Sequence, residues 1–396
     1  MNPISVHHLA TTTSGGAGTA LKRLDTALET ETDIASRVSS QYESKTSLGY
    51  LRYALNHVPI AHRLLTDQCD RKFTPTWIPS GAGDNDDFDI THLHWVAGSL
   101  SPRSIKKIDG PIVWTIHDMW PLTGGCHHAQ ECDKFTRGCG QCPAIGSNRE
   151  RDISHRQFES YRAALSGRDV HLIAPSEWIA KQAERSALVD GPIDVIPNCL
   201  DTELFSPQDP AKAREELSIP QDSNVVLTGG VGLDGSRTKG GDLLVDALAN
   251  LKDHVDPAET VVIQFGNETI NDLPFESRSL GWLETEQLPL VYSSADVMAV
   301  PSRYESFGQT AAESSACGTP VVAFDTSGIR DVVLDGKTGL LAECYDSEQF
   351  ATCIEELFTN SGKAAAFGKA ARGHAVQSWS FATVGRQHRS LYQDVR

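Results

Sequence analysis

Short apolar runs alternate with amphipathic stretches along most of the chain. Runs at 4–9, 111–116 and 170–174 have the length and composition of buried parallel strands. Between such runs, apolar residues recur at the spacing that is typical of one helix face, as in 19–28 and 152–165. Alternating strands and helices predict an α/β fold in which helices cover both faces of a parallel sheet.

The second half of the chain repeats this alternation after the turn Pro197-Asn198-Cys199. Further strands are expected at 193–196, 224–229, 261–265, 295–300 and 320–324, with helices at 288–293 and 381–392. A proline-containing turn between two sheet patterns is typical of a linker, so we predict two domains with a boundary at residue 198. Residues 40–85 are less regular, with an amphipathic helix expected near 48–66 and a polar loop at 81–89.

The stretch from 301 to 339 carries the densest group of candidate site residues. A turn there leads into a helix that carries Glu313 and precedes a buried strand. The start of the helix, from Phe307 through Gly308 to Gln309, offers unpaired backbone N–H groups and a positive dipole end, which suit a diphosphate. Glu305 and Glu313 lie on either side, and carboxylates accept hydrogen bonds from hydroxyls. A sugar nucleotide, whose sugar and ribose hydroxyls flank its diphosphate, fits this order of groups.

A glycine-rich segment, GGVGLDGSRTKGG, joins the strand expected at 224–229 to a helix with apolar residues at 243, 244, 247 and 248. Arg237 and Lys239 stand just before this helix. Two cations in a strand-to-helix turn suit a leaving group that departs with negative charge, such as a diphosphate. The alternative is a pair of solvated loop cations, because loops commonly carry surface charge.

The first half offers candidates at the ends of its strands. His117 follows the strand at 111–116, and residues at the carboxyl ends of parallel strands face the ligand crevice of such sheets. A packed core histidine is the alternative, and His94, which ends the preceding strand, is a further candidate. After the first strand, the loop around Gly16 has the strand, glycine and helix order that opens a nucleotide-binding half, although a simple tight turn has the same pattern.

Four of the nine cysteines lie close together in the sequence. In a reducing cytoplasm this clustering, which ends in a C-x-x-C pair, favours a tetrahedral zinc site over disulfides. We therefore predict a structural metal held by Cys126, Cys132, Cys139 and Cys142, with His127 and His128 as competing ligands. Free or disulfide-paired cysteines are the alternative, because spacing alone does not separate a metal from a disulfide.

The chain of 396 residues has a net charge of −17, from 52 acidic and 35 basic residues, which argues against nucleic acid as a partner. The basic residues comprise 22 Arg and 13 Lys; few lysines among many acids would fit a halophilic source as well as an ordinary acidic protein. No apolar run approaches the roughly 20 residues that span a bilayer, and the first residues lack a signal-peptide pattern. We expect a cytoplasmic protein that can contact a membrane peripherally.

The segment PSRYESFGQTAAESSACGTPVV, at 301–322, resembles the signature of glycosyltransferase family 4, a family of retaining enzymes with the GT-B fold. Its two acids and its Ala-Cys-Gly-Thr-Pro-Val-Val continuation match the family pattern, whereas Gln309-Thr310 departs from it, since many members are apolar there. The GT-B fold implies two facing Rossmann-like domains and a last helix that crosses back to the first domain. The expected division is therefore 1–198 plus 380–396 on the acceptor side, and 199–379 for the donor nucleotide.

The resemblance also implies a role for each candidate residue. The donor would be a nucleotide-diphospho-sugar, and catalysis would need no metal. Lys239 matches the family's Lys-Gly, whereas Leu233 stands near the place of the family's arginine, so Arg237 is expected to replace that arginine. The further implied contacts are Glu313 with the ribose, Glu305 and His117 with the transferred sugar, the amides from Phe307 to Gln309 with the diphosphate, Gly281 and Trp282 with the base, and Gly16 across from the donor.

The cysteine segment GGCHHAQECDKFTRGCGQCP, at 124–143, resembles a segment of a family 4 branch that includes colanic-acid-type and other exopolysaccharide glycosyltransferases. This branch implies a glycan or lipid-linked acceptor, with the cysteines as a clip on an acceptor-side loop. We expect a hexosyltransferase-type activity in polysaccharide or glycoconjugate synthesis. A catalytically silent glycan-binding or scaffold protein and a GT-B epimerase are alternatives. A dehydrogenase is disfavoured, because the glycines at 15, 16 and 18 lack the dinucleotide-binding spacing.

Overall fold

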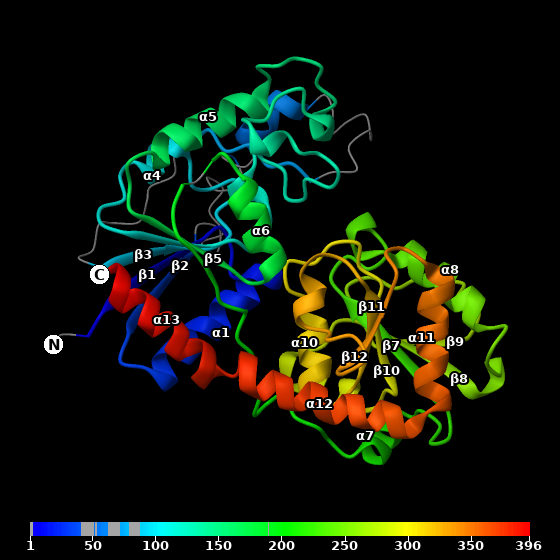
Figure 1. Cartoon of the computed structure of the whole chain (residues 1–396). Coiled ribbons are helices and arrows are strands. Elements are labelled where there is room, and N and C mark those ends of the chain that lie inside the picture. Colours follow the sequence, from blue (N-terminus) through cyan, green and yellow to red (C-terminus); the bar gives the residue numbers. More distant parts are fainter. Residues whose placement is uncertain (1–2, 41–50, 52–53, 62–71, 79–87, 189) are drawn as a thin grey trace. The chain divides into compact units, whose positions relative to one another are not determined.

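The computed structural model describes residues 3–40, 51, 54–61, 72–78, 88–188 and 190–396. The chain forms two compact units, which we call unit 1 and unit 2 (Figure 1). Unit 1 comprises Met1–Pro197 and Val384–Arg396, and unit 2 comprises Asn198–Thr383. Each unit is built on a six-stranded sheet whose neighbouring strands run parallel. The expected α/β class with parallel sheets is therefore confirmed.

In unit 1 the strand order is β2-β1-β3-β4-β5-β6. The strands are β1 (Ser5–Ala10), β2 (Ala35–Ser40), β3 (Ile90–Leu93), β4 (Ile112–Thr115), β5 (Val170–Ala174) and β6 (Ile193–Val195). One face packs on α4 (Pro102–Ile105), α5 (Ile153–Leu165) and α6 (Glu177–Arg185), and the other is covered by α1 (Gly15–Glu31) and α13 (Phe381–Val395) (Figure 1). Short 3-10 helices span Val58–Ile60, Trp120–Leu122, Lys134–Thr136 and Pro143–Ile145.

Side chains alternate between the two faces of this sheet, as the pleat requires. Leu9, Leu93 and Trp114 belong to the core shared with α4, α5 and α6. On the opposite face, His8 of β1 stands in register with His92 of β3. Helix α13 closes over that face, where its Tyr392 hydroxyl lies 2.7 Å from His92 Nδ1. The last helix therefore packs on the first sheet, as the GT-B fold implies.

In unit 2 the strand order is β12-β11-β10-β7-β8-β9. The strands are β7 (Asn224–Gly230), β8 (Thr260–Gly266), β9 (Glu276–Ser279), β10 (Val297–Val300), β11 (Val321–Phe324) and β12 (Gly339–Ala342). Helices α8 (Gly241–Leu251) and α11 (Ser347–Thr359) cover one face, and α7 (Pro210–Glu216), α9 (Leu288–Ser293), α10 (Gln309–Ala316) and α12 (Ser361–Trp379) lie on the other side. Short 3-10 helices span Arg237–Lys239, Pro257–Glu259, Thr285–Gln287 and Ser327–Asp331.

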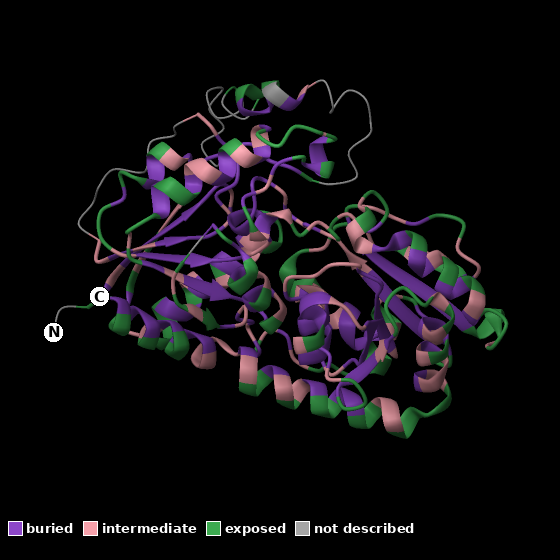
Figure 2. Cartoon of the chain, turned by 45° about the horizontal axis from the view of Figure 1, so that its top comes forward, coloured by how far each residue is buried: buried purple, intermediate pink, exposed green. Residues whose placement is uncertain are grey.

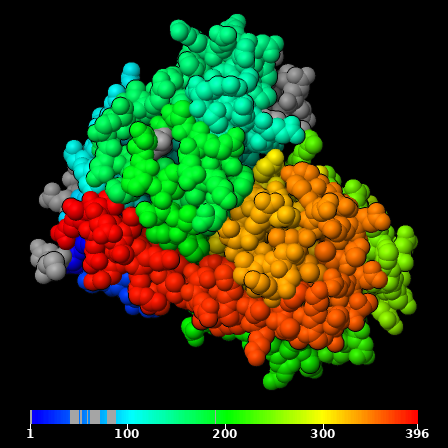
Figure 3. All heavy atoms as spheres, viewed as in Figure 1, coloured from blue at the N-terminus to red at the C-terminus, as the bar shows by residue number. Residues whose placement is uncertain are grey.

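The two helix layers of unit 2 explain its apolar strands. Every residue of β8, β10 and β11 is buried (Figure 2), because helices shield both faces of the sheet. Exposed residues lie in the loops and on the outer sides of helices such as α11 and α12, which form the orange surface of this unit in Figure 3.

Most strands lie within a residue or two of where the apolar runs predict them, and β5 and α9 match the expected ranges. Three strands, all at the edges of the sheets, are not predicted by the sequence pattern. β2 and β9 read ASRVSS and ESRS, so they lack an apolar run, and β12 is a four-residue GLLA. Most of the helix expected near 48–66 and of the loop at 81–89 lies outside the described residues.

In each sheet, successive strands are first added on one side and later on the other, so the strand order reverses at one point. In unit 1 this point lies between β1 and β3, and in unit 2 it lies between β7 and β10. Ligands of open parallel sheets bind beyond the carboxyl ends of the strands at such a point. Ligand-binding residues are therefore expected at these two places. No helix in the described part of the chain is long and apolar enough to cross a membrane.

Candidate active site

In unit 2, two glycines end β7 at the point where the sheet reverses direction. Gly229 and Gly230 have φ values of +155° and +131°, which favour glycine. A Cβ on Gly229 would lie 2.3 Å from the Phe265 carbonyl oxygen, so the neighbouring strand leaves no room for a side chain. A Cβ on Gly230 would lie 3.6 Å from Thr310 in the first turn of α10. The end of β7 and the start of α10 are thus in near contact.

Two loops meet at this edge, one leading from β7 to α8 and one following β10. Lys239 Nζ donates a hydrogen bond to Glu305 Oε1 at 2.7 Å, and the Ser302 hydroxyl donates to the same oxygen at 2.9 Å. Gly240 has a φ of +70°, and a Cβ there would lie 2.0 Å from the Pro301 carbonyl oxygen. The loops pack so closely that only glycine fits. Lys239 and Glu305, predicted from separate motifs, are therefore brought into direct contact.

A second ion pair fastens the same two loops. The guanidinium of Arg303 donates to both carboxylate oxygens of Asp242 at 2.6 Å, and this contact lowers the pKa of Asp242. The Arg303 backbone N–H donates to the Thr238 carbonyl at 2.8 Å, and the Glu305 N–H donates to the Ser327 hydroxyl at 2.9 Å. No sequence motif pointed to these partners, because they meet only through the loop fold. They fix the backbone on both sides of the Lys239–Glu305 contact.

Helix α10 begins beside this contact, at Gln309. Gly308, the residue before it, has a φ of +100°, and a Cβ there would lie 2.5 Å from Ile329 Cδ1. The Phe307 side chain is buried edge-on against Trp379, with ring centroids 5.6 Å apart. Because that ring belongs to the core, Phe307 would contact a ligand through its backbone and not through its side chain. The first turn of α10 carries the amides that the sequence predicts for an anion.

The two predicted acids have separate surroundings. Glu305 faces Lys239 in the loop, whereas Glu313 lies on α10 and is only 6% exposed. The Tyr292 hydroxyl of α9 donates to Glu313 Oε2 at 2.7 Å, which compensates in part for burying a carboxylate. Tyr292 carries no motif of its own, so sequence reasoning missed this partner.

The remaining candidates of unit 2 differ in exposure. Arg237 is exposed, and its carbonyl oxygen accepts from Arg303 Nη1 at 2.9 Å. Leu233, near the place expected for the family's arginine, is a core residue packed with the α8 side chains. Gly281 has a φ of +67° with open space around it, and Trp282 is 65% exposed. None of the contacts described for Arg237, Gly281 and Trp282 joins them to the Lys239–Glu305 pair.

In unit 1, the candidates also lie at strand ends. His117 follows β4 and is half-buried, and its Nε2 lies 3.0 Å from His94 Nδ1. Burial lowers the pKa of His117 to about 4, so the ring is neutral at pH 7, although the adjacent Asp118 opposes this shift. Gly16 lies in the first turn of α1, directly after the loop that follows β1. A Cβ on Gly18 would lie 2.1 Å from the Thr13 backbone, so this loop is tightly folded.

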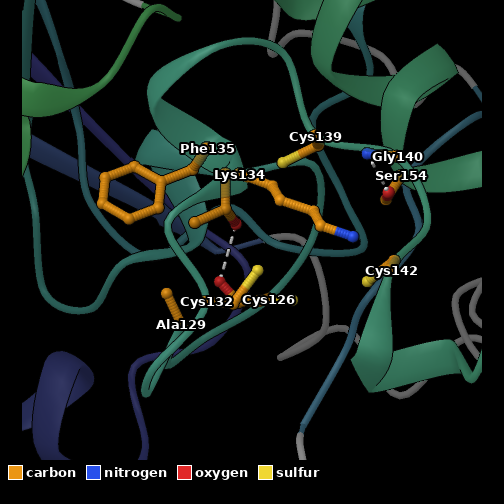
Figure 4. Close-up of a pocket in the computed structure, with 10 residues that line it drawn as sticks. Cys126, Ala129, Cys132, Lys134, Phe135, Cys139, Gly140, Cys142 and Ser154 are labelled. Atoms are coloured by element: carbon orange, nitrogen blue, oxygen red, sulfur yellow. Dashed lines mark hydrogen bonds between the residues drawn. The ribbon is translucent and has the colours of Figure 1, made fainter. Parts of the chain in front are cut away.

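The four clustered cysteines line one small cavity at the surface of unit 1 (Figure 4). They are free thiols. The Cys126 thiol donates a hydrogen bond to the sulfur of Cys142, which lowers the pKa of Cys142 to about 7 and raises that of Cys126. Burial raises the pKa of Cys139 to about 12. The lowered pKa of Cys142 favours the thiolate, which is the form of cysteine that binds a metal, whereas the raised pKa values keep Cys126 and Cys139 protonated unless a metal displaces the proton.

The competing histidines do not join this cavity. His127 Nδ1 lies 2.7 Å from Asp118 Oδ2 and its Nε2 lies 2.8 Å from the Thr74 hydroxyl, so both ring nitrogens are engaged. His128 is not among the residues that line the cavity. Within the described residues, the trio whose ligand atoms lie within 4.8 Å of one another is His8, His92 and His94. Although Cys126 and Cys142 are within hydrogen-bonding distance, the cysteines do not form such a group of three within the described residues, so a tetrahedral metal would draw the four sulfurs together.

Comparison with known proteins adds to this geometry. The family profile "Glycosyltransferase Family 4" matches residues 36–204, and "Glycosyl transferases group 1" matches residues 209–374. A D-inositol 3-phosphate glycosyltransferase of Corynebacterium aurimucosum is 29% identical over 78% of this chain and 72% of its own length. The enzyme of the same name from Mycobacteroides abscessus is 35% identical over 74% of this chain and 63% of its own length.

Solved structures share the fold at low identity. Sucrose-phosphate synthase from Thermosynechococcus elongatus has a TM-score of 0.68 at 19% identity, over 99% of both chains. Anabaena HepE, solved in complex with UDP and glucose, has a TM-score of 0.62 at 19% identity, over 98% of this chain and 99% of its own. The two family profiles and the relatives agree with the signature at 301–322. The chain belongs to glycosyltransferase family 4 and is a glycosyltransferase with the GT-B fold.

Proposed function

We propose that this glycosyltransferase takes its sugar from a nucleotide-diphospho-sugar, holds the nucleotide in unit 2 and transfers the sugar with retention of anomeric configuration. The contact between Lys239 and Glu305 at the reversal point of the second sheet carries this proposal. A diphosphate is an anionic partner for the lysine, and sugar hydroxyls are donors for the glutamate. Each half of the ion pair thus has its own part of a sugar nucleotide to bind.

The neighbouring groups of unit 2 would bind the rest of the donor. The amides from Phe307 to Gln309 would bind the diphosphate at the start of α10, where the helix dipole is positive. Glu313 would accept from the ribose hydroxyls, and Gly281 with the exposed Trp282 would meet the base. Arg237 would add a second charge to the diphosphate. Anabaena HepE, of the same fold, was solved with UDP and glucose, which agrees with a uridine-type donor.

Unit 1 would supply the acceptor side. His117 is neutral and half-buried at a strand end, so its ring can hydrogen-bond to a hydroxyl of the transferred sugar without placing a charge there. The backbone at Gly16 would approach the acceptor or the donor phosphates, because glycine alone permits such closeness. Domain closure would complete this arrangement.

The transfer itself needs a stabilised leaving group more than a nucleophilic side chain. The bond between the anomeric carbon and the diphosphate oxygen breaks, and the acceptor hydroxyl attacks the same face of the sugar. The departing diphosphate takes the acceptor's proton, while Lys239 and the α10 amides stabilise its negative charge. Excluding water protects the oxocarbenium-like sugar from hydrolysis. These residues supply the positive field, so we propose that catalysis needs no metal ion.

The acceptor is proposed as a glycan or a lipid-linked glycan in polysaccharide or glycoconjugate synthesis. The transfer would then take place in the cytoplasm, with peripheral contact at the inner face of the membrane. The relatives named for D-inositol 3-phosphate make that compound a second acceptor to test. Assays that offer both acceptor classes with the same donor would separate them.

The cysteine segment is proposed as a structural metal site on this acceptor side. The four thiols line a single cavity, and Cys142 already has a lowered pKa. Zinc, with four thiolates at about 2.3 Å, would pull the sulfurs together and fix the loop.

Thermal unfolding with a panel of UDP-, GDP-, ADP- and dTDP-sugars tests the donor site. A ligand that binds only the folded protein adds about 2.7 kcal/mol of stability at a hundredfold excess over its Kd. We expect one base family to raise the melting temperature of wild type and of Lys252→Met, an exposed control on the far end of α8. The shift should be weaker in Lys239→Met and in Glu313→Gln.

The outcome also separates an enzyme from a silent binding protein. Transfer to an acceptor, with the product's anomeric configuration read by NMR, would establish both catalysis and retention. A folded protein that no sugar nucleotide stabilises would contradict the donor site in unit 2. Binding of a donor without turnover in the presence of both acceptor classes would favour the scaffold alternative.

A further inference from the structure

Three histidine rings form a hydrogen-bonded chain in unit 1. His8 Nδ1 lies 2.9 Å from His94 Nε2, and His94 Nδ1 lies 3.0 Å from His117 Nε2. His8 belongs to β1, His94 follows β3 and His117 follows β4, so the chain crosses the sheet beside its reversal point. His8 and His94 are buried and His117 is half-buried. The chain therefore runs from the core of unit 1 to the proposed sugar-binding residue.

Neighbouring groups hold the rings in place. The ring of His92 lies against that of His94, with centroids 4.2 Å apart. His92 itself is fixed at both nitrogens, by the Tyr392 hydroxyl at 2.7 Å and the Thr115 hydroxyl at 2.8 Å. His388 of α13 packs on the same cluster, with its ring centroid 6.0 Å from that of His92. The ring of His94, in the middle of the chain, is thus held in one orientation by its neighbours.

The protons of such a chain must all point the same way. A neutral imidazole has one N–H and one bare nitrogen, so each ring donates at one end and accepts at the other. Burial lowers the pKa of His94 well below 6.5 and that of His8 to about 3, so neither ring is protonated at both nitrogens. Two arrangements remain. In one arrangement every N–H in the chain donates in the direction of His117, and in the other every N–H donates in the direction of His8.

Two observations select the direction. His8 Nε2 is buried with no hydrogen-bond partner, and an unpaired N–H in the interior is rarer than an unpaired acceptor. That nitrogen is therefore bare, and His8 carries its proton on Nδ1. At the other end, the negative charge of Asp118 attracts protons towards His117: burial alone would raise the pKa of Asp118, but His127, His128 and the Trp120 amide hold it at about 2. The bare Nε2 of His8 and the charge of Asp118 thus both favour the arrangement in which each N–H donates in the direction of His117.

We propose that His94 and His8 are positioning residues that fix His117 as the tautomer with its proton on Nδ1. His8 donates to His94, His94 donates to His117 Nε2, and His117 presents an N–H at Nδ1. An N–H at that place donates to a sugar oxygen, whereas the other tautomer would offer a lone pair. As a statement about the sugar this rests on the proposed function of His117. As a statement about the proton it rests on the two ring-to-ring hydrogen bonds, the unpaired Nε2 of His8 and the charge of Asp118.

Long-range ¹H–¹⁵N correlation NMR on protein labelled at histidine reads which ring nitrogen carries a proton. We expect His117, identified by the signals lost in His117→Gln, to have a protonated Nδ1 and a bare Nε2. His94→Leu removes the donor, so His117 should take the mixture of tautomers of a free histidine. His8→Asp places an acceptor-only carboxylate opposite His94 Nε2, so the chain should reverse and His117 should carry its proton on Nε2.

His7→Leu is the matched control, because His7 is the neighbouring residue in β1, on the opposite face, with Nε2 2.8 Å from the Ser39 hydroxyl. It should leave the His117 signals unchanged. The buried acid of His8→Asp can prevent folding, in which case His94→Leu alone decides. A wild-type His117 protonated on Nε2, or a His117 still fixed as Nδ1–H in His94→Leu, would overturn the proposal. So would a stoichiometric metal ion held by His8, His92 and His94, since metal ligands need bare nitrogens.

Kinetics separate the proposal from the proposed function. If His117 donates to the transferred sugar, His94→Leu should lower kcat/KM by about tenfold or more, as loss of one strong hydrogen bond does. An altered tautomer with unchanged kcat/KM would uphold the chain and contradict the role of His117 in sugar binding. An unaltered tautomer with a lowered kcat/KM would overturn the chain and leave the sugar site intact.

Discussion

At the scale of single residues, the site of unit 2 depends on one lysine that two loops hold in place. Lys239 is attached to Glu305, while Arg303 and Asp242 tie the same loops together from outside. The Lys239 charge is therefore available for the diphosphate, because the Arg303–Asp242 ion pair stabilises the two loops. The consequence is that Lys239 can be replaced with little loss of loop structure.

Lys239→Met should lower kcat by about a hundredfold or more, since a preorganised charge on the leaving group is lost. The measurement is the initial rate at saturating donor, with Lys252→Met as the control for removing one positive charge. Melting temperatures of both variants show whether the loops persist. Near-full kcat in a folded Lys239→Met protein would refute the diphosphate assignment.

Glu313→Gln should raise the donor KM and leave kcat nearly unchanged, because ribose contacts are made equally in the ground and transition states. The amide oxygen of Gln can still accept from Tyr292, so the buried hydrogen bond survives. Steady-state kinetics against donor concentration provide the test, with exposed Glu348→Gln as control. An equal fall in kcat would move Glu313 from donor binding to catalysis.

At the scale of elements, the start of α10 is set by backbone geometry more than by side chains. Gly308 has no side-chain cap to replace, and Ile329 occupies the space beside it. The helix N–H groups are therefore aimed by a left-handed residue held against the 3-10 helix at 327–331. A change at that residue tests the anion site without touching a charge.

Gly308→Ala should destabilise unit 2 and weaken donor binding. The left-handed backbone alone costs about 1–2 kcal/mol for a residue with a Cβ, and the contact at 2.5 Å with Ile329 adds to it. Gly336→Ala is the control, since Gly336 has a φ of +66° and open space. Chemical denaturation of both, with titration of the donor, gives the comparison. Equal effects of the two substitutions would show that Ile329 plays no part.

The cysteine segment is the second element for which we make a prediction, namely that a bound zinc ion stabilises it. Protein purified without a metal-affinity tag should contain about one zinc per chain, and chelation should lower the melting temperature, because structural zinc contributes directly to folding energy. Cys142→Ser should lose the metal, whereas Cys353→Ser on α11, outside the cluster, should keep it. Metal well below one equivalent in folded wild type would reject the site.

At the scale of the whole molecule, buried histidines link stability to pH. Burial lowers the pKa of His8 to about 3, and of His117 and His388 to about 4, from 6.5. The unfolded chain then binds protons below pH 6.5 that the folded chain does not. Their contribution to stability is complete above about pH 6.5 and is lost as the pH falls from there towards about 4.

The free energy of unfolding should therefore fall by about 1.2 kcal/mol for each such histidine between pH 6 and pH 5. Denaturant midpoints over this range measure the slope for unit 1. His388→Gln should flatten it, because one buried titrating ring is removed. The carboxylates with lowered pKa values, such as Asp33 and Asp242, titrate below this window. A flat profile from pH 7 to pH 5 would contradict the buried neutral state.

The fold could be predicted from sequence because its central strands are apolar runs with few alternatives. Strands such as β5, between two helix layers, must be apolar on both faces, so each is visible as a run. The strands β2 and β9 were missed, because an exposed edge strand can be polar and is defined by its pairing partner. Their existence depends on hydrogen bonds to distant residues, which no local pattern records.

For the site, sequence by itself determined which residue types are present and at what spacing: the acids at 305 and 313, Lys239 after a glycine loop, and His117 after a strand. Local chemistry and the family signature suffice for that. Only the tertiary structure decided the partners: Lys239 with Glu305, Glu313 with Tyr292, and His117 with His94 and His8. The physical reason is that strands far apart in the chain end at the same edge of a sheet. Side chains 21 to 86 positions apart then share hydrogen bonds that the order of the sequence does not reveal.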